Sequence, residues 1–176
     1  LIAIMLWWSP AINRVLDPYL VVLNALPKIA LGPILIVWFG AGITSIIVMA
    51  LLISFVVTIM SVLAGFNEIT GEKQLLMKTL GASKLQIFTM VVLPASLPTI
   101  MNALKISVGM SWVGVIVGEY LVSKAGLGYL IVYGGQVFKL DLVMASIVVL
   151  CLLAALMYYG VAYMEKKLVK WRMHGG

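Results

Sequence analysis

The stretch IALGPILIVWFGAGITSIIVMALLISFVVTIMSVLAGFN, residues 29–67, contains no Asp, Glu, Lys or Arg. One membrane-spanning helix needs about 20 apolar residues. These 39 residues are therefore long enough for two spans. Gly40-Ala41-Gly42 lies near the middle of the stretch and favours a turn there. The stretch predicts a helical hairpin in a lipid bilayer, with its second helix from about Thr44 to Ala64.

The remainder of the 176-residue chain has the same apolar character. Apolar residues make up 64% of the chain and charged residues 10%, whereas a soluble domain usually has about 45–50% and about 25%. A soluble fold of this length could not bury so much apolar surface. The composition excludes a soluble enzyme, a disordered tail and a disulfide-stapled secreted module. It predicts an all-α polytopic membrane helix bundle, with residues 1–176 forming one domain.

Uncharged stretches also predict the other spans. The first helix of the hairpin should begin near Pro18, with Asp17 as its cap, and Pro27 and Pro33 should kink it. Two later spans are expected, and a short or re-entrant element at 125–138 separates them. Residues 1–8 are interpreted as the end of a span that begins before this chain, which gives about five spans in all. The two later spans cover about Ala103–Val122 and Leu142–Met164.

The distribution of Lys and Arg predicts the orientation. Ten of the twelve fall in segments that this map places on one side, and Lys124 and Lys139 fall on the other. Cytoplasmic segments of membrane proteins carry an excess of Lys and Arg. We therefore expect a cytoplasmic C-terminus, and we attribute the net charge of +6 to this excess rather than to nucleic-acid binding. The ten are Arg14, Lys28, Lys73, Lys78, Lys84, Lys105, Lys166, Lys167, Lys170 and Arg172.

Few residues in the chain can perform chemistry. Cys151 and His174 are the single cysteine and the single histidine, so no disulfide, CxxC motif or multi-ligand metal cluster can form within the chain. The sequence also lacks the G-x-x-x-x-G-K-[ST] phosphate-binding loop. We expect no catalytic residue, no metal site and no cofactor bound by this chain.

One polar segment, residues 66–94, interrupts the apolar pattern. Good helix formers run from Glu72 to Leu80, and Gly81 can end that helix in a left-handed conformation. Ser83 and Gln86 then form an S-x-x-Q capping box that starts a second helix. Pro94 is expected to disrupt or kink this second helix. The segment predicts a helix, a tight glycine turn and another helix on the cytoplasmic side.

This segment admits three interpretations. It can be an ordinary connecting loop, or a DNA-reading helix-turn-helix, which its position between two membrane spans disfavours. The third interpretation is a docking helix for a soluble partner. Apolar Leu75, Leu76 and Leu80 beside basic Lys78 and Lys84 fit that role.

The run G-A-S-x-x-x-x-F-x-x-V-x-L-P-x-x-x-P at residues 81–98 resembles the signature of permease subunits of binding-protein-dependent ABC importers. The family motif opens with Glu-Ala-Ala, whereas this chain has Leu75-Leu76-Met77, so no role of that acidic residue carries over. Other stretches resemble the nitrate/sulfonate/taurine branch. They are Leu16-Asp17-Pro18, Leu26-Pro27, Pro33, Trp38-Phe39-Gly40, Glu119 and Gly126-Leu127-Gly128-Tyr129-Leu130-Ile131.

The resemblance implies a type I importer permease fold in the inner, or plasma, membrane of a prokaryote. It implies a pair of ATP-binding cassette ATPase subunits that use ATP and Mg²⁺, a second permease copy, expected as a homodimer, and a solute-binding protein. Segment 66–94 would be the coupling segment. The alternative is a membrane sensor or scaffold that transports nothing. The implied coupling residues are Leu76, Leu80, Gly81, Ala82, Ser83, Lys84 and Pro94.

Small residues recur along one face of the span at 103–122. Ala103, Ser107, Ser111, Gly114 and Gly118 follow one another at helical spacing. Such a face favours close helix packing in lipid, and it can also line a translocation path or contact a second permease copy. Two interpretations of the next residue, Glu119, stay open, a gate or a structural anchor. The candidate path or dimer-contact residues are Ser107, Ser111, Gly114, Gly118 and Glu119.

Overall fold

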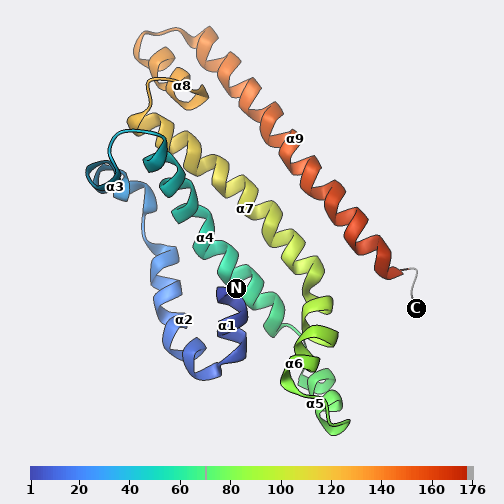
Figure 1. The fold of residues 1–176 in the computed structure, drawn as a ribbon. Coiled ribbons are helices and arrows are strands. Elements are labelled where there is room, and N and C mark those ends of the chain that lie inside the picture. Colours follow the sequence, from blue (N-terminus) through green and yellow to red (C-terminus); the bar gives the residue numbers. More distant parts are fainter. Residues whose placement is uncertain (70, 174–176) are drawn as a thin grey trace.

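The computed structural model describes residues 1–69 and 71–173, and every regular element in this part of the chain is helical. Figure 1 shows these elements in chain order. The all-α prediction is confirmed. The elements are α1 (Ile2–Trp8), α2 (Pro10–Ala25), the 3₁₀ turn η1 (Lys28–Leu31), α3 (Gly32–Phe39), α4 (Ile43–Asn67), α5 (Gly71–Thr79), α6 (Lys84–Ile87), the π-helical turn η2 (Phe88–Val92), α7 (Leu93–Val122), α8 (Leu127–Gln136) and α9 (Leu140–Met173).

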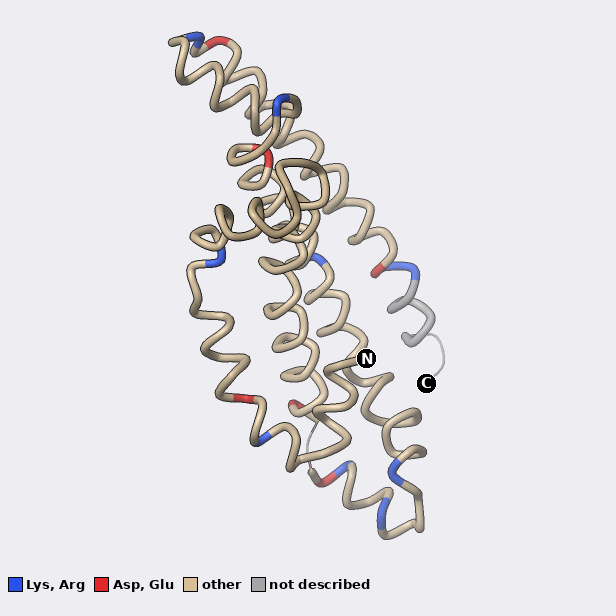
Figure 2. The backbone as a smooth tube through the Cα atoms, turned by 60° about the vertical axis from the view of Figure 1, so that its left-hand side comes forward, with Lys and Arg blue, Asp and Glu red and all other residues tan. Residues whose placement is uncertain are grey.

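The long helix α7 lies between the long helices α4 and α9 and contacts both, as Figure 1 shows. The short helix α8 lies at one end of this bundle, whereas α5 and α6 lie at the opposite end. Figure 2 shows long stretches without charged residues along the tube. This arrangement places the polar segment 66–94 far from the connection between α7 and α9.

In the described part of the chain, three helical segments are long and apolar enough to cross a bilayer. They are α4, the continuous run Lys84–Val122 and the segment Leu140–Lys167 of α9. A fourth crossing results if α2 and the segment Lys28–Phe39, which meet at a bend of 82°, count as one broken span. The polytopic bundle expected from the charge-free stretches is confirmed, and the predicted turn at Gly40 separates α3 from α4.

The predicted start of the first hairpin helix is wrong. Helix α2 begins at Pro10, and Ser9 caps it, because the Ser9 hydroxyl accepts a hydrogen bond from the Ile12 N–H at 3.4 Å. Pro18 lies inside α2 and Asp17 precedes it within the same helix. Ser9-Pro10 and Asp17-Pro18 carry the same start signal, a capping side chain followed by proline. The structure uses the first of them.

The helix predicted to start near Ala103 begins ten residues earlier, at Leu93. Pro94 occupies its first turn, where a missing backbone N–H costs little. Pro98 lies inside the helix without ending it. The expected disturbance around Pro94 takes the form of η2, the π-helical turn directly before α7.

A buried apolar cluster holds the polar end of the bundle together. It joins α1, the last turns of α4, α6 and η2. Aromatic contacts run through it, since the ring centroids of Phe66 and Phe88 lie 5.6 Å apart and those of Trp7 and Phe88 lie 5.1 Å apart. The coupling segment is therefore attached to α1 and α4 by packing. The buried members are Ala3, Leu6, Ile59, Leu63, Phe66, Ile87, Phe88 and Val92.

Candidate functional site

The turn at Gly81 has the predicted left-handed conformation, with φ of +80°. The Ala82 N–H donates to the Met77 carbonyl at 3.0 Å, and the Gly81 N–H donates to the Lys78 carbonyl at 3.0 Å. This pair of bonds is a Schellman motif, which satisfies carbonyls at the end of a helix. The end of α5 is thus determined by its own backbone together with the freedom of glycine at position 81.

The predicted capping box is also present, and it begins α6. The Ser83 hydroxyl accepts from the Gln86 N–H at 3.3 Å, while the Gln86 side-chain oxygen accepts from the Ser83 N–H at 2.8 Å. Because each side chain satisfies the backbone of the other residue, α6 starts at a defined residue. The helix, turn and helix of segment 66–94 form a preorganised unit.

The predicted coupling residues lie in two environments. Leu76 and Leu80 are exposed, at 62% and 74% of their full surface, so both are accessible to a partner. Lys84 instead turns back toward α1, where its ammonium group donates to the Trp8 carbonyl. Pro94 lies beyond η2 and is half-buried. The structure therefore brings the turn residues together and sets Pro94 apart from them.

The contact of Lys84 with α1 was not predicted from the sequence. Its Nζ lies 5.6 Å from the centroid of the Trp7 ring and 5.4 Å from that of Trp8. Ammonium groups are attracted to the faces of indole rings at such distances. No sequence pattern links Lys84 to Trp8, which lies 76 positions earlier. The adjacent tryptophans Trp7 and Trp8 at the end of an apolar helix were the only available signal of such a contact.

Three of the small residues of α7, Ser107, Gly114 and Gly118, contact α4. A Cβ atom added to Gly114 would lie 2.4 Å from the Cα atom of Ala50, and one added to Gly118 would lie 2.9 Å from the Cα atom of Ile46. The Ser107 hydroxyl shares a hydrogen bond with the Thr58 hydroxyl of α4. These contacts give the face a packing role within one chain, as the packing interpretation predicts. A role of these residues in a path or a dimer contact stays a prediction.

Glu119 binds the start of α8. Its carboxylate accepts a hydrogen bond from the Gly128 N–H at 2.7 Å. A helix N-terminus carries partial positive charge, so a carboxylate there is stabilising. A Cβ atom at Gly126, which has φ of +113°, would lie 2.4 Å from the Glu119 carboxyl carbon. The contacts correspond to the structural anchor, one of the two interpretations of this residue.

A second group of functional candidates, between α7 and α9, was not predicted. Lys105 and Glu165 form an ion pair whose side chains are 17% and 26% exposed, and the Lys105 ammonium group lies 5.9 Å from the Tyr158 ring centroid. Lys105 lines a cavity of about 410 Å³, and a second cavity of about 370 Å³ shares Val108 and Trp112 with it. Ser107 and Ser111 line the smaller one. A lysine and a glutamate far apart in the sequence gave no signal that they would meet.

The described residues contain no group of three or more His, Cys, Asp or Glu side chains that could hold a metal ion. Cys151 is exposed on α9, and His174 lies outside the described residues. The candidate functional features are therefore the turn at Gly81, the glycine face of α7, the start of α8 at Glu119, and the ion pair of Lys105 and Glu165.

Comparison with known proteins places these features in context. Residues 1–170 match the family described as "Binding-protein-dependent transport system inner membrane component". The taurine transport system permease protein of Escherichia coli is 32% identical over 99% of this chain, which spans 62% of that protein. The formylaminopyrimidine transport permease protein of Halalkalibacterium halodurans is 31% identical over 98% of this chain, with 69% of that protein covered.

A third relative is a putative aliphatic sulfonates transport permease protein of Bacillus subtilis. It is 30% identical over 98% of this chain, which spans 62% of its length. The chain thus corresponds to somewhat less than two thirds of the taurine and sulfonate relatives that it matches.

Proposed function

We propose, because this chain belongs to the family of binding-protein-dependent transport system inner membrane components, that it is the transmembrane subunit of an ATP-driven importer. In this proposal, it forms part of the path for a small solute delivered by a binding protein. Taurine, organic sulfonates and formylaminopyrimidines are the solute classes that the names of its relatives support.

The observation that carries the proposal is the preorganised turn between α5 and α6. It lies at one end of the bundle (Figure 1), and Leu76 and Leu80 are exposed beside it. Monomeric proteins rarely leave large apolar side chains gathered on a polar surface unless a partner covers them. An ATP-binding cassette subunit that docks over this turn would cover both leucines.

ATP hydrolysis is assigned to a separate subunit. The sequence has no phosphate-binding loop, and the family supports a non-enzymatic transport role. In the proposed cycle, ATP closes the ATPase pair, the coupling segment moves with it, and the permease pair opens toward the binding protein. Hydrolysis then resets the pair. A ligand drives such a change only through different contacts in the two states.

The orientation and the assembly are also part of the proposal. The excess of Lys and Arg supports a cytoplasmic location of segment 66–94 and of the C-terminus, on the side where ATP is present. A homodimer of permeases would match a pair of ATPases. The multi-pass membrane location follows from the family and from the apolar helices.

The test is reconstitution of the full-length protein with its cognate ATPase and binding protein in proteoliposomes. Uptake of radiolabelled taurine, ethanesulfonate and formylaminopyrimidine is measured with and without ATP. ATP-dependent uptake of any of them supports the importer. Stable assembly with the ATPase but no uptake of any solute would favour the sensor or scaffold alternative. Failure to bind an ATPase at all would contradict the proposal.

A Leu80→Glu variant sharpens this test, with Leu51→Glu as a comparison. Leu80 is exposed beside the coupling turn, whereas Leu51 is exposed on the apolar helix α4. The proposal expects Leu80→Glu to insert normally and to lose the ATPase in a pull-down. Leu51→Glu places a charge within a span, so it should impair insertion instead.

A further inference from the structure

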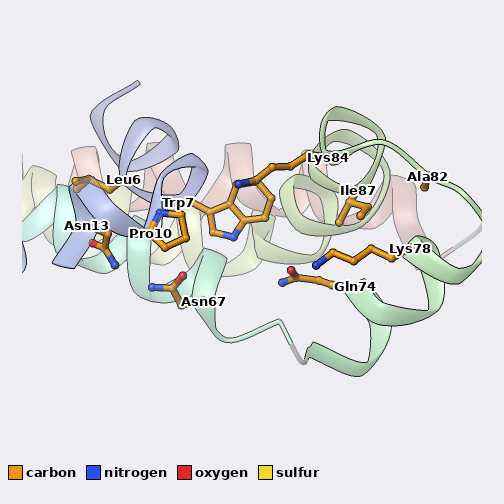
Figure 3. A pocket seen from close by; sticks show the side chains of 10 residues that line it. All are labelled: Leu6, Trp7, Pro10, Asn13, Asn67, Gln74, Lys78, Ala82, Lys84 and Ile87. Atoms are coloured by element: carbon orange, nitrogen blue, oxygen red, sulfur yellow. The ribbon is translucent and has the colours of Figure 1, made fainter.

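A cavity of about 430 Å³ lies between the coupling segment and the first two helices. Figure 3 shows side chains from α1, α2, α4, α5 and α6 around it. A volume of this size matches the smaller ligand-binding pockets of proteins. The residues that carry the argument are Trp7, Asn13, Asn67, Gln74, Lys78 and Lys84.

The polar lining of this cavity is positive. Two ammonium groups and three amides line it, and no Asp or Glu does so in the described part of the chain. Lys84 is held by the Trp8 carbonyl, whereas Lys78 forms no ion pair among the described residues. Figure 3 shows the ends of Lys78 and Gln74 directed toward one space, whereas the end of Lys84 lies at the Trp7 ring. Two ammonium groups at one cavity attract an anion.

One polar atom of the lining residues lacks a partner. The side-chain Oδ1 of Asn13 is buried and accepts no hydrogen bond from any described residue. Buried polar atoms nearly always have a partner. The protein covers this oxygen, and in Figure 3 it points away from the ends of Lys78, Lys84 and Gln74, so a ligand would reach it only after the Asn13 side chain turned.

We propose that this cavity binds a small organic anion, one that carries a phosphate or sulfonate group. The anionic group lies between Lys78 and Lys84 and accepts charge-assisted hydrogen bonds from them. The amides of Asn67 and Gln74 donate to its remaining oxygens. Trp7 covers the apolar part of the ligand.

Occupation of the cavity would tie α5 and α6 to α1 and α2, because the binding residues come from both sides of it. A bound anion would therefore hold the coupling segment in place. Binding itself does not depend on the proposed function, whereas an effect on ATP-driven coupling rests on it. The ligand reaches the cavity from the side of the membrane on which the coupling segment lies.

The test uses lysine labelling of the full-length protein in nanodiscs of neutral lipid, with glycerol 3-phosphate as the probe. Labelling of each lysine is measured by mass spectrometry of peptides. The proposal expects saturable protection of Lys78 and Lys84. Lys73 is the internal control, because it is exposed on α5 like Lys78 but does not line the cavity. It should keep its reactivity. Glycerol, which has the hydroxyls but no charge, should protect neither Lys78 nor Lys84.

A Lys78→Gln variant tests the same site through the protection of Lys84 by the probe. Loss of one charge-assisted hydrogen bond should raise the concentration needed to protect Lys84 by about tenfold. Unchanged labelling of Lys73 shows that the substitution does not alter lysine reactivity in general. Three results would overturn the proposal: equal protection of Lys73 and Lys78, unchanged protection of Lys84 in the variant, or protection that requires phosphatidylglycerol in the nanodisc. None of these measurements involves transport, so failure of the importer assignment would be recognised separately.

Discussion

Gly114 of α7 lies so close to Ala50 of α4 that a Cβ atom on Gly114 would be 2.4 Å from the Cα atom of Ala50. Gly118 approaches Ile46 of the same helix in a similar way. Small residues allow two helix backbones to approach in lipid, where van der Waals packing replaces the hydrophobic effect as the driving force. This contact sets the position of α7 on α4, and through α7 it positions Glu119 and the start of α8.

Gly114→Leu should impair folding or assembly of the permease, because the new side chain cannot fit between α7 and the backbone of α4. Overpacking of this kind typically costs about 1–3 kcal/mol. Thermal unfolding in detergent measures the loss. Gly109→Leu is the matched control on the same helix, because no atom lies within 4 Å of a Cβ at Gly109. Equal stability of the two variants would show that the α4–α7 contact is not needed.

Gly81→Ala should weaken the coupling turn without changing its surroundings. A Cβ at Gly81 meets no atom within 4 Å, but its φ of +80° is unfavourable for alanine. That conformation costs about 1–2 kcal/mol for a residue with a Cβ. Gly71→Ala, which also has open space and does not have a positive φ, is the control. ATPase activity and solute uptake by the reconstituted complex are measured together.

We expect Gly81→Ala to reduce ATP-driven uptake and Gly71→Ala to leave it intact. Gly81→Pro should abolish coupled uptake while membrane insertion is retained, because proline cannot adopt a positive φ. Full uptake by Gly81→Pro would remove the coupling role from this turn. Loss of insertion in that variant would instead show a requirement of the turn for folding.

Glu119→Ala should loosen α8, since it removes the acceptor of the Gly128 N–H. An unpaired, partly buried donor costs about 1–3 kcal/mol. Glu119→Gln keeps an acceptor oxygen and loses only the charge at the helix terminus, an effect of about 0.3–1 kcal/mol. Hydrogen exchange at the first turn of α8 should therefore rise more in Glu119→Ala than in Glu119→Gln. The opposite order would point to a role of the charge itself, as in a gate.

Charge reversal tests the pair formed by Lys105 and Glu165, which joins α7 to α9. Lys105→Glu and Glu165→Lys should each lower the unfolding temperature, because each places two like charges side by side at the pair. The double variant restores opposite charges, so its unfolding temperature should recover. A double-mutant cycle isolates this coupling from the effect of each single change. Additive single effects would show that the two helices do not depend on the pair.

Uptake by the double reversal variant answers a further question. If the pair serves only to hold α9 on α7, uptake should recover together with stability. If Lys105 also acts on an anionic solute in the cavity that it lines, uptake should stay low in a stable protein. The two readouts are measured on the same preparation.

The sequence alone determined the features that depend on neighbours along the chain. The long charge-free stretches predicted α4 and α9. The short element that was predicted before the last span corresponds to α8. The turn at Gly81 and the capping box of Ser83 form through hydrogen bonds within a few residues. At the start of α2 the sequence analysis chose Pro18, and the choice was wrong because Ser9-Pro10 carries an equivalent local signal.

Only the tertiary structure decided which faces meet. A helix such as α4 is apolar all around, so its sequence does not mark the side that receives Gly114. Glu119 meets Gly128 because α8 folds back across the end of α7. Lys105 meets Glu165 across 60 residues, and Lys84 meets Trp8 across 76. Such contacts depend on the packing of all the helices at once, whereas the local turns depend only on the residues that form them.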